Sequence, residues 1–173
     1  MVEIKAQLTI QYLASFIFFI GLVVLVYLAY SANIPTFVQE VERENTYSKA
    51  FQLSEILVNN PGQPRNWTNI NANNFKRLGF SDEKTNKSNM ISYIKVQQLG
   101  NGICNFVDIQ NKLAMNRSFS IFIFNITENG NRAQLAYCTS PTFPRAAVNV
   151  TVKRITAMNN SGKIELAELI VQM

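Results

Sequence analysis

The sequence predicts an α+β protein, in which a long N-terminal helix packs on a small antiparallel β-sheet. No Asp, Glu, Lys or Arg occurs from Ala6 through Gln39, whereas soluble chains carry a charge at about every fourth residue. The last third of the chain instead alternates apolar and polar side chains, which is the period of β-strands. The length of 173 residues suits one domain with an appendage.

The charge-free run predicts a helix that spans a membrane. Its centre, Leu13–Tyr30, is almost purely apolar. At about 1.5 Å per residue, the stretch from Leu8 to Ser31 would cross a hydrocarbon core of about 30 Å. Lys5 precedes the run, and the Lys/Arg bias predicts a cytoplasmic N-terminus with the bulk of the chain outside. We therefore expect a single-pass protein of the cell membrane, with lipid around this helix.

The helix is expected to continue beyond the membrane as an amphipathic segment. Pro35 should kink the helix or restart it at its first turn. From Phe37 to Val58, apolar residues recur at spacings of three and four, which marks one helical face. The sequence Asn59-Asn-Pro-Gly-Gln-Pro64 then ends the helix.

The remaining residues predict loops, short helices and then a sheet. Short helices are expected at Asn73–Leu78, Ile91–Leu99 and Asn105–Met115. Glu128-Asn-Gly130 is a hairpin signal between two of the expected strands. Four antiparallel strands in meander order would bury their apolar face against the amphipathic half of the helix. These strands are Ser118–Asn125, Arg132–Thr139, Val148–Ala157 and Lys163–Gln172.

Two features agree with an extracytoplasmic domain. Cys104 and Cys138 either form one disulfide, as is usual in exported domains, or are two independent buried thiols. Sequons for N-glycosylation indicate a glycoprotein, although a chain this rich in Asn, Ser and Thr contains some by chance. The six sequons begin at Asn66, Asn86, Asn116, Asn125, Asn149 and Asn159.

The composition argues against several function classes. Without histidine there can be no Ser-His-Asp triad and no imidazole metal site, and the two cysteines form no metal-binding cluster. The net charge of +5 is scattered rather than gathered into a basic stripe, so we expect a solvated surface and no nucleic-acid partner. The carboxylate pairs Asp82–Glu83 and Glu165/Glu168 show no sign of converging on a cleft. We expect no enzyme, catalytic residue, cofactor or metal.

The N-terminus carries the most informative residues. Lys5-Ala6-Gln7 leads directly into the apolar helix, whereas a secretory signal is cut after its apolar run, for which Ala29-Tyr-Ser31 is a weak candidate. The pattern of a basic residue, a small residue and Gln before an apolar helix resembles the archaeal type IV pilin-like proteins with class III signal peptides. The Pro-Gly-x-Pro-x-x-Trp turn at Pro61–Trp67 and the closing strand pair also resemble that family.

The resemblance implies a function and one departure from the family. A prepilin peptidase would cut between Ala6 and Gln7, and the mature helix would assemble with copies of itself or other pilin-like subunits. The family usually has Glu at the fifth mature position, where this chain has Gln11. Gln11 can donate a hydrogen bond during assembly but cannot neutralise the amino-terminal charge of a neighbouring subunit. The implied organisation is a leader at 1–6, a transmembrane and assembly helix at 7–34, and an extracytoplasmic domain at 35–173. Within that domain we expect a helix at 36–58, loops and short helices at 59–116, and the sheet at 117–173.

We therefore expect a structural pilin-like subunit, major or minor, of an archaeal surface filament or pseudopilus. The alternative is a monomeric, membrane-anchored extracellular module that binds a surface glycan or protein. A third interpretation is a secreted enzyme released by cleavage after Ser31. The N-terminus of the expressed protein distinguishes the three.

Overall fold

The computed structural model describes residues 2–69, 75–83, 87–113, 115, 117–140 and 150–173. The chain divides into two compact units, Met1–Glu42 and Arg43–Met173. Helix α1 (Val2–Asn59) forms the first unit and continues into the second. Its 58 residues pass through Pro35 without a break, so the helix is not restarted there. The long apolar N-terminal helix expected from the sequence is therefore confirmed.

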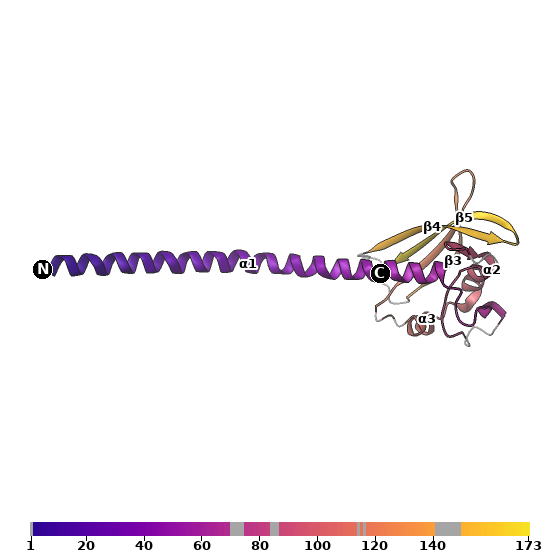
Figure 1. The fold of residues 1–173 in the computed structure, drawn as a ribbon, viewed down its shortest axis with the longest axis horizontal. Coiled ribbons are helices and arrows are strands. Elements are labelled where there is room, and N and C mark those ends of the chain that lie inside the picture. The colour runs from indigo at the N-terminus through magenta and orange to yellow at the C-terminus, as the bar shows by residue number, and fades with distance from the viewer. Residues whose placement is uncertain (1, 70–74, 84–86, 114, 116, 141–149) are drawn as a thin grey trace. The chain divides into compact units, whose positions relative to one another are not determined.

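The second unit is an α+β domain built on five strands (Figure 1). A 3-10 turn, two short α-helices and a π-helical segment precede most of the sheet. In chain order its elements are η1 (Trp67–Asn69), β1 (Met90–Ser92), α2 (Tyr93–Gln98), η3 (Leu99–Ile103), α3 (Phe106–Lys112), β2 (Ser120–Ile126), β3 (Arg132–Thr139), β4 (Thr151–Asn160) and β5 (Lys163–Gln172).

The strand order is β1-β4-β5-β2-β3, so the predicted meander is wrong. The hairpins β2–β3 and β4–β5 form as expected, but they join through β2 and β5, which pair antiparallel. Strand β1 adds to β4 in parallel, which makes the sheet mixed rather than antiparallel. The reason lies in burial: β5 holds an unbroken buried run from Ala167 to Val171 and takes a central place, whereas β3 begins with three exposed residues and forms an edge.

Several predicted local elements also differ from the structure. The helix expected from Ile91 begins only at Tyr93, because Met90–Ser92 pairs with β4 instead. The helix expected at Asn73–Leu78 is absent from the described part, Phe75–Leu78, where Phe75 and Leu78 are buried anchors. Residues 73–74 and 148–149 lie outside the described residues, and β4 extends beyond the predicted end to Asn160.

The core lies between the C-terminal part of α1 and one face of the sheet, which we call the inner face. Ala50, Leu53, Leu57 and Val58 of α1 are at most 3% exposed and belong to one cluster with buried sheet residues such as Leu169. Their spacing of three, four and one is the helical face that the sequence predicted. Two further contacts bind α1 to β4: Arg154 forms an ion pair with Glu55, and its guanidinium lies 5.1 Å from the ring centroid of Phe51.

The segment that follows α1 packs around one tryptophan, Trp67. Trp67 is fully buried, packs its ring 5.6 Å from that of Phe75, and donates a hydrogen bond of 2.9 Å from Nε1 to the carbonyl of Gly79. Gly79 has no room for a side chain, because a Cβ there would lie 2.1 Å from the carbonyl oxygen of Asn60. The segment around Gly79 therefore passes directly against the end of α1.

A disulfide joins Cys104, just after η3, to Cys138 of β3. It ties the short-helix segment to the edge strand, across a sequence separation of 34 residues. Of the two alternatives left open by the sequence, the structure contains the disulfide. On the chain-entropy model, a loop of this length stabilises the folded state by roughly 3–4 kcal/mol.

Gly79→Ala should destabilise the domain by about 3 kcal/mol, because the new methyl group would overlap backbone atoms that have little freedom to move. Denaturant unfolding in detergent solution, followed by the fluorescence of Trp67, the single tryptophan, measures the change. Gly130→Ala is the control: its φ of 76° costs about 1–2 kcal/mol, but the added Cβ meets open space. Equal losses for the two variants would contradict the close approach at Gly79.

Replacing both Cys104 and Cys138 by Ser should lower the free energy of unfolding by about 2–4 kcal/mol. The same denaturant titration measures it, and adding a reductant to the wild-type protein should reproduce the loss. The reductant should leave the double variant unchanged. A wild-type protein whose stability does not respond to reductant would argue against a stabilising role for this bond.

Candidate functional site: an exposed apolar helix

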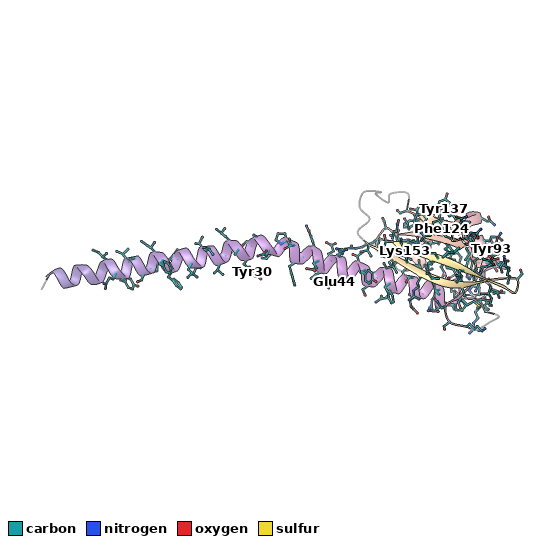
Figure 2. The ribbon with its side chains drawn as sticks, turned by 90° about the horizontal axis from the view of Figure 1, so that it is seen from above. Tyr30, Glu44, Tyr93, Phe124, Tyr137 and Lys153 are labelled. Carbon is teal, nitrogen blue, oxygen red and sulfur yellow. A yellow bond between two sulfur atoms is a disulfide. The ribbon has the colours of Figure 1, made fainter. Side chains whose placement is uncertain are left out.

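The candidate site is the stretch of α1 from Ile10 to Glu42, in which every residue is exposed except the half-buried Ser31. Among the described residues, α1 is the one helix long and apolar enough to span a membrane. Its most apolar window has a mean hydropathy of 2.5, and 0% of that window is buried. Side chains along this stretch, Tyr30 among them, project outward from the helix (Figure 2).

An exposed apolar surface of this kind is unfavourable in water and is normally buried against lipid or protein. Leaving apolar area in water costs about 25 cal/mol per Å², and Phe18, Leu25 and Tyr27 are each more than 65% exposed. Lipid tails or the apolar helices of other chains would provide that cover at no such cost. The stretch is therefore long and apolar enough to span a membrane, and its exposed surface is of the kind that lipid or other apolar helices cover.

Two polar side chains within the stretch form hydrogen bonds to the helix itself. Asn33 donates a hydrogen bond of 2.8 Å from Nδ2 to the carbonyl of Ala29, and Thr36 donates one of 2.7 Å from Oγ1 to the carbonyl of Asn33. Side-chain donors that bond back to their own helix are compatible with an apolar environment, which has no water to accept from them. These bonds flank Pro35, which supplies no backbone N–H.

Small residues interrupt the large ones near the N-terminal end of the stretch. A Cβ added to Gly21 would meet nothing within 4 Å, so packing within this chain does not require a glycine there. Ala14 and Ser15 are likewise exposed. Small residues allow the backbones of neighbouring helices to approach closely, so any packing role of these three would be between chains.

The predicted processing residues lie on the same helix as the apolar stretch. Lys5, Ala6 and Gln7 fall inside α1, which begins at Val2, although their side chains are outside the described ones. Gln11, the predicted assembly residue, is exposed about one turn further along. The structure thus places Lys5, Ala6 and Gln7 on the helix ahead of the exposed apolar stretch, without assigning these residues a role.

The described sequons differ in the state of the side-chain nitrogen that would carry a glycan. Asn66 is exposed in the loop after α1. Asn125 instead donates from Nδ2 to Glu165 at 2.9 Å, and Asn159 donates to Asp82 at 2.6 Å. The sequons at Asn86, Asn116 and Asn149 begin outside the described residues.

The carboxylates considered as catalytic candidates form separate interactions and do not meet in one site. Glu83 forms an ion pair with the buried Lys95 at 2.9 Å, and Asp82 accepts the hydrogen bond from Asn159. Glu165 and Glu168 are three residues apart on β5, so they lie on opposite faces of the sheet. Among the described residues, no group of three or more His, Cys, Asp or Glu could hold a metal ion.

Sequence reasoning missed a second exposed apolar surface, on the face of the sheet turned away from α1. Ile155, Ile164 and Leu166 are each more than half exposed there. The signal was present in β2, where Ile-Phe-Ile-Phe at 121–124 is apolar at successive positions and therefore on both faces of the strand. The expectation of a single buried face overlooked it.

No family model, curated protein or solved structure matches the chain.

An oligosaccharyltransferase acting on the folded protein should modify Asn66 in preference to Asn125 and Asn159. Modification of the latter two would break side-chain hydrogen bonds that hold β2 and the β4–β5 turn. Glycopeptide mass spectrometry measures the occupancy of each site, and reduced, unfolded protein is the control, in which the preference should disappear. Equal occupancy of Asn66 and Asn159 in the folded protein would contradict this ranking.

Proposed function

We propose that this chain is a structural, pilin-like subunit that is stored in the membrane by α1 and assembles through the same helix into a surface filament or pseudopilus. The observation that carries the proposal is the exposed surface of α1 from Ile10 to Gln39, which holds no charged residue and which Lys5-Ala6-Gln7 precedes. A prepilin peptidase would remove residues 1–6 and leave the helix attached to its domain.

Physical considerations support both stages. Before assembly, the apolar side chains from Ile10 onward would face lipid, because exposing them to water is prohibitive. After removal of the leader, which carries Glu3 and Lys5, the mature helix would hold no charged side chain until Glu40. It could then be drawn out of the membrane and buried among like helices without desolvating a charged side chain.

The domain that follows suits display outside the cell. Its disulfide is typical of oxidising compartments, and its packing does not depend on the exposed part of α1, since the two form separate compact units. In this proposal the domain over Arg43–Met173 forms the outer surface of the assembly and the helix forms its centre. Gln11 would contribute a hydrogen bond during assembly rather than a charge pair.

Ala6→Trp should block removal of the leader, because the proposed processing requires a small residue before the cut. Ala6→Gly keeps the residue small and is the matched control, which should be processed like the wild type. Co-expression with a prepilin peptidase, followed by intact-mass measurement, reports the loss of residues 1–6. Electron microscopy of the processed protein should then show filaments, and the Ala6→Trp protein should show none.

The alternatives give different results in the same experiment. An uncut N-terminus in the wild-type protein would favour a membrane-anchored binding module. A new N-terminus at Ala32 would favour secretion after Ser31. Correct cutting of the wild type without any filaments would contradict a self-assembling subunit.

A further inference from the structure

The outer face of the sheet, which is the face turned away from α1, carries a continuous apolar patch. We define this outer patch by six residues: Phe122 and Phe124 of β2, Tyr137 of β3, Ile155 of β4, and Ile164 and Leu166 of β5. Ile155 is 63% exposed, Ile164 is 60% exposed, and Leu166 and Tyr137 are each 54% exposed. Figure 2 labels Phe124 and Tyr137 together with Lys153, which lies on the same face of β4.

The strand register makes the patch continuous across four strands. Residues directly opposite each other on antiparallel strands share a face. Tyr137 lies opposite Phe122, which lies opposite Ile170 of β5. In the next row, Phe124 lies opposite Glu168, which lies opposite Ile155. Leu166 extends the patch by one further row.

The one acidic residue in these rows, Glu168, has its charge balanced by Arg132 of the same chain. Glu168 is only 5% exposed although it lies on the outer face, between Phe124 and Ile155. Its Oε2 lies 3.2 Å from Nε of Arg132, without the alignment of a hydrogen bond, and has no hydrogen-bond partner among the described residues. A buried carboxylate paired in this way adds no net charge, so the centre of the patch fits a neutral, apolar surface.

The exposed apolar area of the patch is comparable to that of the apolar core of a protein–protein interface. Its exposed apolar area is on the order of 500 Å², at the upper end of what soluble monomers leave uncovered. A stable pair of proteins buries about 800 Å² on each partner. The patch therefore supplies most of one such interface, and the polar ends of the same four strands would supply the rim.

We propose that the outer patch is the docking surface for the outer patch of a second copy of this chain, with the two sheets packed face to face. A flat apolar sheet face fits another one at about 10 Å, as in β-sandwiches. The same face of a second copy brings the compensated Glu168–Arg132 pair to the centre. Lys153 ends the row of Tyr137, Phe122 and Ile170, and its long side chain can carry the ammonium group out to the rim. The contact is self-complementary, as two-fold interfaces require.

A lipid surface fits the patch less well. Attraction to anionic headgroups requires uncompensated cations around an apolar patch. Arg132 forms an ion pair with Glu168. Within the described rows of the outer patch, Lys153 is therefore the single cation outside an ion pair. The charge distribution therefore favours a protein face over a headgroup layer.

Cysteine cross-linking tests the contact in the full chain. The native cysteines are joined in the disulfide, so an introduced cysteine is the single free thiol among the described residues. Leu166→Cys places a thiol within the patch, and Val107→Cys places one on α3, at a position that is 61% exposed against 54% for Leu166. With a bis-maleimide of about 10 Å reach, the Leu166→Cys protein in membranes should give at least about tenfold more covalent dimer than the control. Equal yields would overturn the proposal.

A charge introduced into the patch provides the second test. Adding Ile155→Glu to the Leu166→Cys protein should lower the yield of cross-linked dimer about tenfold, because two copies would bring unpaired carboxylates together. Adding Val107→Glu should leave the yield unchanged. An unchanged yield with Ile155→Glu would overturn the face-to-face arrangement. Protection of the thiol introduced by Leu166→Cys from a soluble maleimide by vesicles, without covalent dimer, would also overturn it and indicate a lipid surface.

The result is separable from the proposed function. The contact lies within Arg43–Met173 and does not need leader removal, so adding Ala6→Trp to the Leu166→Cys protein should leave the cross-linking yield unchanged. Filaments formed without the cross-link would overturn only the outer-patch contact. A cross-link without processing or filaments would overturn only the pilin-like function.

Discussion

The domain depends on the burial of one helical face of α1 against the inner face of the sheet. Ala50, Leu53, Leu57 and Val58 are almost fully buried there, and the Trp67 segment is packed against the end of the same helix. Without this helix, the inner face of the sheet would be exposed. The same element that carries the apolar N-terminal surface thus completes the core of the domain, so a change to the C-terminal part of α1 acts on the fold of the domain.

Two kinds of apolar surface in the chain have different consequences. The first, on α1 from Ile10 to Gln39, carries no charged residue and suits a hydrocarbon environment. The second, the outer patch, belongs to a flat sheet and suits another flat face. In the proposed assembly, the two surfaces would hold copies of the chain together at two levels, through the helix and through the domain. The disulfide stabilises the domain that carries this second surface.

The features that were predictable are local ones. The membrane-grade helix followed from the absence of charge between Ala6 and Gln39, and the β2–β3 and β4–β5 hairpins followed from turn residues and alternation. The strands Arg132–Thr139 and Lys163–Gln172 have the bounds that the pattern indicated. The cysteine pair was one of two stated alternatives, because spacing alone does not bring two thiols together.

The amino-acid sequence by itself determined the long N-terminal helix, the turns of the two hairpins, and which segment has to leave water, because those properties depend on neighbours within a few residues. Only the tertiary structure decided that β2 and β5 pair at the centre, that Met90–Ser92 forms a strand beside β4, and that Glu168 is buried on the outer face beside Arg132. These depend on which distant segments meet. Many different strand pairings bury a similar apolar area, and the apolar–polar alternation of side chains within one strand does not determine which strand it pairs with.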